Sequence, residues 1–302
     1  MADQQHIIVG IGELLWDLFP SGKQLGGAPS NFSYITNLLG DTGIPASRIG
    51  NDALGDEAVQ HLSQLGVTTN YLQRDGTYPT GTVNVALDSS GQPSFEILRP
   101  VAWDFFEWTP VWQRLAEQAD AICFGSLAQR ASESRSTIGH FLCATCPDAV
   151  RVFDVNLRQN FYSKDVIKES LGRATIVKLN HDELPVVTRL LGWEHHGEKE
   201  SAGRLLSFAG MKLVCVTRGV HGSLLITRDR CSEHPGFKVE VVDTVGAGDA
   251  FTAALLHSYL RAEPLDRMNE NANRVGAWVA SQAGGMPAVQ GSGLQAILAR
   301  IA

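Results

Sequence analysis

After Pro110, apolar segments alternate with amphipathic segments almost to the end of the chain, and this alternation restricts the fold more than any other feature. The apolar segments 121–125, 150–155 and 213–217 are short and bounded by polar residues, as buried strands are. The segments between them have the spacing of helices. Strands that alternate with helices form a parallel sheet covered on both faces. The sequence therefore predicts an α/β fold.

The same patterns predict where the individual elements lie. We expect strands at 6–11, 46–50, 121–125, 150–155, 175–179, 213–217 and 237–242. We expect helices at 32–39, 52–65, 111–118, 133–143, 163–171, 250–260 and 270–282, helices that begin at His181 and Lys199, and a short terminal helix. Gly40 and Gly66 follow two of these helices, and a glycine commonly ends a helix.

Residues 80–98 interrupt this alternation. Polar and apolar residues alternate one by one there, with a turn at 88–91, which predicts a β-hairpin with no helix between its strands. A second hairpin is expected at 223–242. We expect segment 79–102 to form, with residues near 12–25, a small β element inserted into one large α/β domain. That domain would span residues 1–302.

Polar residues follow the predicted strands at six places. Open α/β sheets bind ligands at the carboxyl ends of their strands, so these residues are candidates for a site. The clusters are Glu13 with Asp17, and residues 26–31, 154–158, 180–183, 217–222 and 243–249. A scaffold alone does not need so many, and we infer a ligand site at this edge of the sheet.

The segment DTVGAGDAF, residues 243–251, precedes and begins a predicted helix. Free backbone N–H groups and the helix dipole attract anions at such a place. Phe251 excludes the dinucleotide-binding fingerprint, which needs glycine there, and no P-loop sequence occurs in the chain. In one interpretation this is a tight turn, with Asp249 interacting with the helix dipole. In the other, Asp249 is a base beside an anion site, which phosphoryl transfer to a hydroxyl requires.

This segment resembles the C-terminal signature of the ribokinase-like (PfkB-type) carbohydrate kinases. The N-terminal signature of that family is similar to GGAPSN at 26–31, Gly40, IGND at 49–52 and Gly55. The resemblance covers about residues 7 to 290, with the motifs in the order of the family. Among its subgroups, GELLWD at 12–17 and Arg99-Pro100 look like bacterial fructokinases. The resemblance implies a three-layer fold, with a mainly parallel central sheet covered by helices and a small β-sheet lid.

The resemblance also implies roles in catalysis and sugar binding. The implied catalytic residues are Asp249 as base, Gly246, Ala247 and Gly248 as the anion hole for the γ-phosphate, and Arg158 near the transferred phosphate. The implied sugar-binding residues are Asp17, Gly27, Asn31, Arg99 and Asp249. Two of these residues have a structural alternative, because Asn31 could cap a helix and Arg158 could be a surface residue after a strand.

The nucleotide and metal sites follow from the same resemblance. The implied nucleotide-binding residues are Asn180, Thr217, Gly219, Gly222, Gly246, Gly248, Asn273 and Ala277. Glu183 is associated with Mg²⁺, through water, since Mg²⁺ keeps several waters. Asn180 and Glu183 also have the spacing of a capping box, which is the structural alternative. A K⁺ site would use Asp243, Val245 and Gly284, while Ala288 stands where the family often has a side-chain oxygen.

Composition excludes several other classes of protein. The net charge is −7, and no long basic run occurs, which argues against nucleic acid and anionic membranes as partners. No apolar run reaches the ~18 residues of a membrane span, and the N-terminus does not read as a signal peptide. Five cysteines do not make a disulfide framework. These features predict a cytoplasmic protein.

We therefore expect an ATP-dependent sugar kinase, most similar to enzymes that convert fructose to fructose 6-phosphate. Two alternatives keep the fold. One is a kinase of 2-keto-3-deoxygluconate, ribose or a nucleoside, and the other is a non-catalytic sugar-binding relative. The expected cofactors are ATP, Mg²⁺ and K⁺. The resemblance also implies that the lid closes over the sugar and forms the interface of a homodimer.

Overall fold

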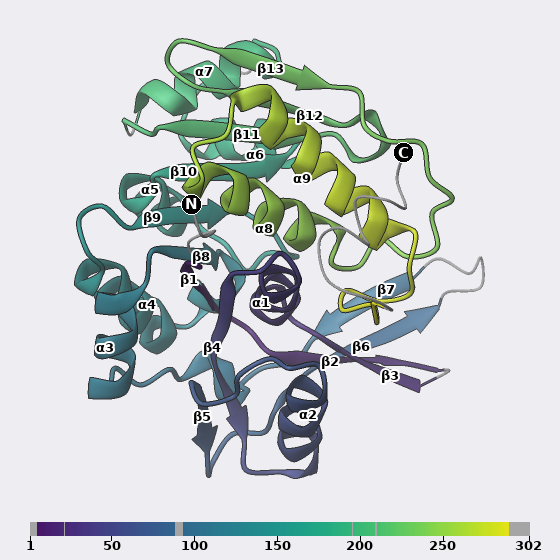
Figure 1. Cartoon of the computed structure of the whole chain (residues 1–302). Helices are drawn as coiled ribbons and strands as arrows, with labels where there is room; N and C mark the ends of the chain where they lie inside the picture. The colour runs from purple at the N-terminus through teal and green to yellow at the C-terminus, as the bar shows by residue number, and fades with distance from the viewer. Residues whose placement is uncertain (1–4, 21, 88–92, 195, 209, 290–302) are drawn as a thin grey trace.

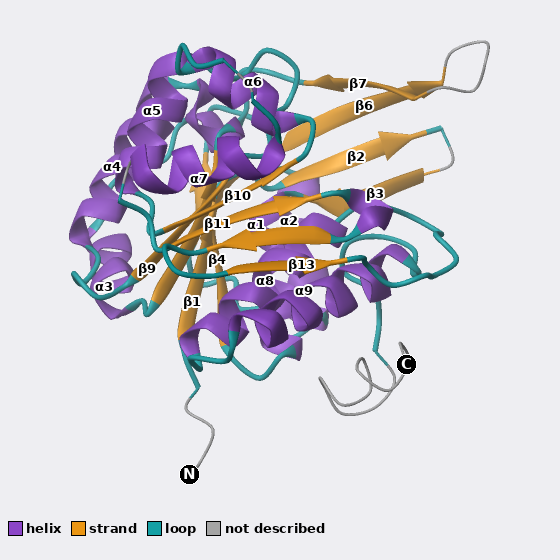
Figure 2. Cartoon of the chain, turned by 90° about the horizontal axis from the view of Figure 1, so that it is seen from above, coloured by secondary structure: helices purple, strands orange, loops and turns teal. Residues whose placement is uncertain are grey.

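The computed structural model of the chain describes residues 5–20, 22–87, 93–194, 196–208 and 210–289 (Figure 1). A large sheet runs through the centre of the molecule, with helices on both sides, and four further strands project from one end (Figures 1 and 2). The predicted mainly parallel sheet covered by helices, with a small β lid, is confirmed.

The central sheet has nine strands in the order β13-β12-β11-β10-β9-β8-β1-β4-β5. The strands are β1 Ile7–Ile11, β4 Thr42–Gly50, β5 Leu72–Asp75, β8 Ala121–Gly125, β9 Val150–Asp154, β10 Ile176–Asn180, β11 Leu213–Thr217, β12 Ser223–Ile226 and β13 Cys231–His234. From β11 to β5 neighbouring strands are parallel, whereas β12 and β13 pair antiparallel at one end. The carboxyl ends of the parallel strands therefore share one edge, where the candidate site lies.

The helices form two layers. The α-helices are α1 Ala28–Leu38, α2 Ala53–Gln64, α3 Pro110–Gln118, α4 Ser132–Ala144, α5 Lys164–Arg173, α6 Glu183–Leu190, α7 Glu198–Phe208, α8 Ala247–Leu260 and α9 Leu265–Ala280, and 3₁₀ turns lie at Ala102–Asp104, Leu127–Arg130 and Gly219–His221. Polar caps define several starts, because the side chains of Asp52, Thr109 and Ser163 each accept a hydrogen bond from a first-turn N–H. Helices α1, α2, α8 and α9 share one core cluster, and α3 to α7 share the other.

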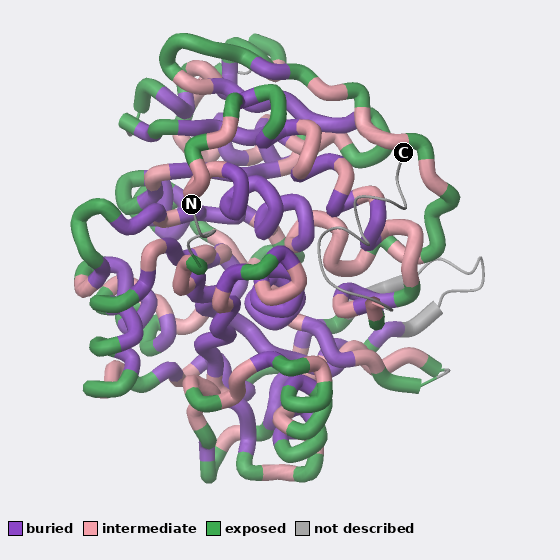
Figure 3. Tube along the Cα trace, viewed as in Figure 1, coloured by how far each residue is buried: buried purple, intermediate pink, exposed green. Residues whose placement is uncertain are grey.

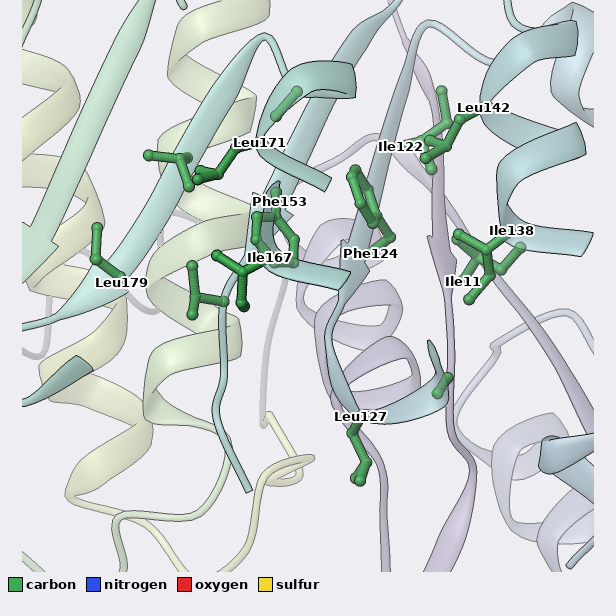
Figure 4. Close-up of a cluster of buried hydrophobic side chains, with 14 of the residues drawn as sticks. Ile11, Ile122, Phe124, Leu127, Ile138, Leu142, Phe153, Ile167, Leu171 and Leu179 are labelled. Atoms are coloured by element: carbon green, nitrogen blue, oxygen red, sulfur yellow. The ribbon is translucent and has the colours of Figure 1, made fainter. Parts of the chain in front are cut away.

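Strand β1 separates the two cores because its side chains alternate between the faces of the sheet. Ile8 belongs to the core beneath α1 and α8, whereas Val9 and Ile11 belong to the opposite core. In that second core Phe124 and Phe153 stack with ring centroids 5.3 Å apart (Figure 4). Buried chain runs through the middle of the molecule, and exposed chain lies at its periphery (Figure 3). The strands that carry the site are therefore held rigidly from both faces.

The lid is a four-stranded sheet in the order β3-β2-β6-β7, with β2 Leu15–Phe19, β3 Gly22–Gly26, β6 Gly81–Leu87 and β7 Pro93–Ile97. Its two hairpins are antiparallel, but β2 and β6 are parallel, so the lid is a mixed sheet rather than a purely antiparallel insertion. In Figure 1 these strands extend away from the helices. The predicted turn at 88–91 and the terminal helix lie outside the described residues.

Several local predictions differ from the structure. The hairpin after residue 223 ends at His234, and the expected strand 237–242 does not form. Pro235 has no N–H for a sheet, Gly236 has φ +84°, and the N–H of Val242 donates instead to Ala280 on α9. Other differences concern where elements start: β4 begins at Thr42 and α9 at Leu265, four and five residues before the predicted starts, and α1 and α8 also begin early.

Helices α1 and α8 begin four and three residues earlier, respectively, than the apolar pattern indicated. Helix α1 begins at Ala28, with a proline in its first turn, so Asn31 is inside the helix and does not cap it. Helix α8 begins at Ala247, with Gly246 as its N-cap, so Gly248 and Asp249 belong to its first turn.

Candidate functional site

The candidate site is built around the first turn of α8. Gly246 adopts the left-handed conformation, with φ +75°, and a Cβ there would lie 2.4 Å from the Cα of Gly285. Only glycine satisfies both restrictions. The chain therefore turns sharply into α8, whose first turn lies between the two cavities described below. The N–H of Ala247 donates to the carbonyl of Thr244 at 3.3 Å.

Asp249 lies in this first turn and is held by α1. The Nδ2 of Asn31 donates a hydrogen bond to Oδ2 of Asp249 at 2.9 Å. Burial raises the pKa of Asp249 to about 6, although Asn31, Lys178 and Arg158 oppose this effect. The carboxyl group can therefore both accept and release a proton near neutral pH.

A buried ion pair lies beneath the same turn. The Nζ of Lys178, on β10, is 3.1 and 3.0 Å from the two carboxylate oxygens of Asp154 on β9. The hydroxyl of Thr252 donates to Asp154 at 3.0 Å. A Cβ on Gly248 would lie 3.1 Å from the Nζ of Lys178, so this ammonium group adjoins the glycine turn. Burial alone would lower the pKa of Lys178, but the carboxylates of Asp154, Glu183 and Asp249 together outweigh it and raise the pKa.

Lys178 was missed by the sequence analysis, and Asp154 appeared there only as part of a strand-end cluster. A usable signal for Lys178 was present, because a lysine interrupts the otherwise apolar segment IVKL. Charged side chains are seldom buried unless they are paired. The partner of Lys178 is 24 residues away, and only the parallel pairing of β9 with β10 brings the two together.

One cavity of about 470 Å³ lies between the lid and the carboxyl ends of the strands. Its size is within the usual range of small-molecule sites. Predicted residues in its wall are Asp17, Gly27, Asn31, Arg158, Val245 and Asp249. Burial raises the pKa of Asp17 to about 6, and the exposed Arg158 opposes this shift. The wall therefore offers carboxylate and amide groups, together with one guanidinium, to a polar ligand.

A second cavity, of about 340 Å³, lies on the other side of the α8 turn. Predicted residues in its wall are Asn180, Thr217, Gly219, Gly222, Ala247, Gly248, Asn273 and Ala277. Apolar side chains of Phe237, Val239 and Val241 line it as well. Thr244 lines both cavities, so the two meet at the start of α8. The start of α8 therefore lies between two cavities, each large enough for a small-molecule ligand.

Gly222 and Asn273 have clear structural constraints in this second cavity. Gly222 has φ +79°, and a Cβ there would lie 1.9 Å from the carbonyl oxygen of His234. The Nδ2 of Asn273 donates to the hydroxyl of Ser223 at 2.7 Å. Both residues thus shape the wall through contacts with the neighbouring hairpin.

Some predicted residues lie outside the walls of both cavities. The guanidinium of Arg99 lies over the ring of Phe161, 5.5 Å from its centroid. Gly246 is the N-cap residue of α8 and is not among the residues that line either cavity. Glu183, Asp243 and Gly284 connect loops around the site.

Glu183 forms a capping box with Asn180. Its Oε2 accepts from the N–H of Asn180 at 2.8 Å, and the Oδ1 of Asn180 accepts from the N–H of Glu183 at 2.8 Å. Its Oε1 accepts from the N–H of Leu157 at 2.7 Å. Burial raises the pKa of this carboxyl. Glu183 therefore joins the ends of β9 and β10, and each oxygen keeps a second lone pair for a water molecule.

Asp243 joins the two loops that the K⁺ prediction named. Its carboxylate accepts from the N–H of Val245 at 3.0 Å and from the N–H of Gly284 at 3.1 Å. Within the described part of the chain, no group of three or more His, Cys, Asp and Glu side chains has the arrangement of a metal site.

Glu13 is a further residue of the site that had been given no role. It lies just after β1, is 5% exposed, and lines the cavity of about 470 Å³ together with Asp249. The strand-end rule indicated this position, but the sequence could not show how close Glu13 lies to Asp249.

The chain is similar along most of its length to proteins of one family. A sequence profile described as pfkB family carbohydrate kinase matches residues 21–290. The fructokinase of Klebsiella pneumoniae is 32% identical over 262 residues, which cover 82% of each protein. No helix of the described residues has the length and apolar character needed to cross a membrane.

Solved structures show the same architecture. An uncharacterized sugar kinase from Pyrococcus horikoshii in complex with ATP is 30% identical, covers 93% of this chain and 94% of its own, and superposes with a TM-score of 0.80. The fructokinase of Vibrio cholerae in a fructose-, ADP- and calcium-bound form is 26% identical, with coverage of 99% and 100% and a TM-score of 0.82. A double mutant of that enzyme has fructose, ADP and potassium bound.

Proposed function

The chain belongs to the pfkB family of carbohydrate kinases and is a phosphotransferase that acts on a sugar hydroxyl; we propose that it transfers the γ-phosphate of ATP to fructose. The observation that carries this proposal is the position of Asp249. It faces the cavity beneath the lid, while the neighbouring Ala247 and Gly248 face the second cavity. A sugar and a nucleotide bound on the two sides would meet at this turn.

In the proposed reaction Asp249 accepts the proton of the attacking hydroxyl. A base with a pKa of about 6 is largely ionised at pH 7 and still has substantial proton affinity. Asn31 fixes its orientation, so the carboxylate needs no reorganisation as the hydroxyl attacks. Asp17, Gly27 and Asn31 bind the other sugar hydroxyls, and Arg99 contributes when the lid closes.

Positive charge at the turn stabilises the transferred phosphoryl group. Phosphoryl transfer depends mainly on positioning and on electrostatic stabilisation of the phosphoryl oxygens. The N–H groups after Gly246, at Ala247 and Gly248, provide the anion hole. Arg158 approaches from the sugar side, and Lys178 lies beneath Gly248. These groups provide the local positive charge that a protein of net charge −7 needs at this site.

The second cavity binds ATP in this proposal. Asn180, Thr217, Gly219 and Gly222 lie along the phosphates and the ribose, and Asn273 and Ala277 flank the base. The sugar kinase from Pyrococcus horikoshii has the same fold and its structure is a complex with ATP, which supports this assignment.

The proposed cations are Mg²⁺ and K⁺. Because both oxygens of Glu183 already accept backbone N–H groups, this residue suits a hydrated ion that it holds through water. Bound with ATP, Mg²⁺ would neutralise phosphate charge. For K⁺, Asp243 fixes the loops of Val245 and Gly284, whose carbonyls are candidate ligands. The potassium-bound form of the Vibrio cholerae enzyme supports the K⁺ proposal.

We propose fructose because relatives named fructokinase are similar in sequence to most of this chain. An ADP-coupled assay with fructose, ribose, 2-keto-3-deoxygluconate and a nucleoside tests it. We expect the highest kcat/KM with fructose and the largest rise in Tm on fructose binding. A higher kcat/KM with another acceptor would replace fructose by that acceptor. No turnover with any of them would contradict sugar phosphorylation and favour a non-catalytic sugar-binding protein.

We propose that the chain is one α/β domain whose lid closes over the sugar and also mediates a homodimer. Closure would exclude water, which otherwise competes as phosphoryl acceptor. Strands β3 and β7 are the lid's two edges, and among the described strands neither has a second neighbour. Sedimentation of the intact protein tests the dimer.

Closure predicts a smaller radius of gyration with fructose bound than without it. Small-angle X-ray scattering of the free and the fructose-bound protein measures this difference. Identical curves at saturating fructose would contradict closure of the lid, while leaving the phosphotransferase activity untouched.

A further inference from the structure

Glu13 is a buried carboxyl group close to the proposed base. Its Oε1 accepts a hydrogen bond from the N–H of Ala28 at 3.3 Å. Burial raises its pKa to about 7, backbone N–H groups and Arg158 oppose this shift, and the charge of Asp249 adds to it. Burying such a group weakens the fold, since an ionised carboxylate is poorly stabilised there. The position of Glu13 therefore calls for a functional explanation.

A small cavity brings Glu13 and Asp249 together. It has a volume of about 20 Å³, and the polar residues of its wall include Glu13, Asp154, Asn156, Asp249 and Thr252. A cavity of this size holds about one water molecule, and a buried water needs two to four polar partners. The rest of its wall is largely apolar, with Ile11, Phe32, Phe124 and Leu127 among its residues. A water here would be confined and would reach both carboxyl groups.

The proposed reaction leaves a proton on Asp249 after every turnover, and this proton must leave before the next one. The Nδ2 of Asn31 is a donor and cannot take it. Lys178 is already protonated and is paired with Asp154, whose oxygens also accept from Thr252. Arg158 is a permanent cation. Cys123 also lines the cavity, and burial raises the pKa of its thiol, which therefore stays neutral.

We propose that Glu13 receives this proton from Asp249 through a water molecule in the small cavity, and thereby returns the base to its ionised form. The inference rests on the proposed function. The sugar O–H bond breaks as an O–H bond forms on Asp249. The proton then passes to the water, which gives up one of its own protons to Glu13. No atom is oxidised or reduced.

Two further observations agree with this route. Burial raises the pKa of Glu13 and the pKa of Asp249 into the same range near neutrality, so a proton can pass between the two carboxyl groups. Glu13 also lines the larger cavity beneath the lid. Once the lid opens, the proton can leave to solvent from there. Because Glu13 acts only through Asp249, it is a positioning residue: it holds the proton that Asp249 releases.

Glu13→Gln removes the acceptor and keeps the size of the side chain. We expect kcat to fall at least about tenfold, less than the ~10²–10⁴-fold effect of a direct base, because Asp249 remains. The KM for the sugar should change less than twofold, and the solvent deuterium isotope effect on kcat should increase. Glu13→Asp should recover part of kcat. Glu117→Gln, on the exposed face of α3, is the matched control and should change none of these quantities.

Infrared titration gives a second readout that needs no turnover. We expect the ligand-free wild-type protein to show a protonated carboxyl band that titrates near pH 7 and is absent from Glu13→Gln. Wild-type kcat and isotope effect in Glu13→Gln would overturn the proposal. A raised KM at unchanged kcat would also overturn it, because Glu13 would then contact the sugar.

The same titration covers the remaining outcomes. If Glu13→Gln does not fold, the absence of a titrating band in the wild-type protein would overturn the proposal. Failure to phosphorylate every sugar, with the band present, would contradict the proposed function and leave Glu13 as a proton-holding group. The two failures are therefore distinguishable.

Discussion

Asp249 depends on side chains that come from four other segments of the chain. Asn31 is on α1, Lys178 is on β10, Arg158 follows β9, and Glu13 follows β1. Burial raises the proton affinity of Asp249, and the two cations and the amide limit that rise. This balance gives Asp249 a pKa that suits the base we propose, whereas a solvent-exposed aspartate would titrate at lower pH.

Replacing Asp249 by asparagine removes the base but keeps an oxygen that can accept from Asn31. We expect kcat to fall by at least about 100-fold, the lower end for loss of a general base. ATP binding, measured by calorimetry, should change little, because Asp249 does not line the second cavity, where we propose that ATP binds. Turnover at the wild-type rate would exclude Asp249 as the base.

The buried pair of Lys178 and Asp154 tests whether charge beneath the turn assists catalysis. Lys178→Met leaves Asp154 buried without its partner, and breaking such a pair costs about 3–5 kcal/mol. We expect a lower free energy of unfolding by denaturant titration, together with a lower kcat.

The double variant Lys178→Met with Asp154→Asn separates these two effects. It removes both charges, so most of the lost stability should return. The kcat should stay low, because the ammonium beneath Gly248 is still missing. Recovery of kcat together with stability would show that Lys178 only maintains the fold.

At the scale of elements, the site is the junction of α1, α8 and the loop at 284–287. Gly246 at the start of α8 packs against Gly285, and a Cβ on Gly285 would meet the side chain of Asn31. The hydroxyl of Tyr34, one turn further along α1, donates to the carbonyl of Pro287 at 2.6 Å. The loop therefore fixes the distance between α1 and the start of α8.

Gly285→Ala tests this junction. Its Cβ would lie 2.6 Å from the Oδ1 of Asn31, so Asn31 must turn and its hydrogen bond to Asp249 must weaken. We expect kcat to fall about tenfold or more with little change in Tm, since the side chain of Asn31 can rotate without moving the backbone.

Gly172→Ala, in α5, is the matched control. A Cβ there meets nothing within 4 Å. It should keep wild-type kcat and gain roughly 0.5–1 kcal/mol of stability, because alanine favours a helix. Wild-type kcat in Gly285→Ala as well would contradict the proposed coupling between this loop and the base.

At the scale of the whole molecule, the site is accessible to ligands, and its buried carboxyl groups lower the stability of the fold. Two layers of helices keep the strand ends rigid, and the lid leaves the edge of the sheet accessible to ligands. Burial raises the pKa of Glu13, Asp17 and Asp249 together. Their ionised forms are therefore less stable in the folded chain than in the unfolded chain.

The sign of this effect can be measured for Asp249. Its folded pKa of about 6 exceeds the ordinary value of 3.8, so the folded state binds this proton more tightly. Its contribution to stability is present below pH ~4 and is lost as pH rises through about 6. We expect Asp249→Asn to have a higher Tm than the wild type at pH 8, and the difference should close toward pH 4.

Asp148→Asn, at an exposed position, is the control for this titration and should show no such pH-dependent difference. Equal Tm values of Asp249→Asn and the wild type at pH 8 would contradict the inference that ionised Asp249 lowers the stability of the folded chain. Calorimetry of the ligand-free proteins between pH 4 and 8 makes the comparison.

Much of the local order was readable from the sequence. The apolar segments 121–125 and 213–217 are strands β8 and β11 with the predicted bounds, and Asp52 caps α2 at the predicted start. The segment 237–242 looked equally strand-like but forms no strand. After Pro235 and Gly236 the chain leaves the edge of the sheet and bonds to α9, and residue patterns do not report such long-range contacts.

The sequence by itself determined the class of the protein and the position of its glycine turn. Alternating strand and helix patterns require a covered parallel sheet, and glycines at the start of a helix allow a close backbone approach. The tertiary structure alone decided which side chains meet at that turn. Lys178 pairs with Asp154, and Glu13 shares a cavity with Asp249, because parallel pairing aligns strands that are far apart in the chain. Burial and charge act through space, so residue order could name the candidates but could not set their pKa values.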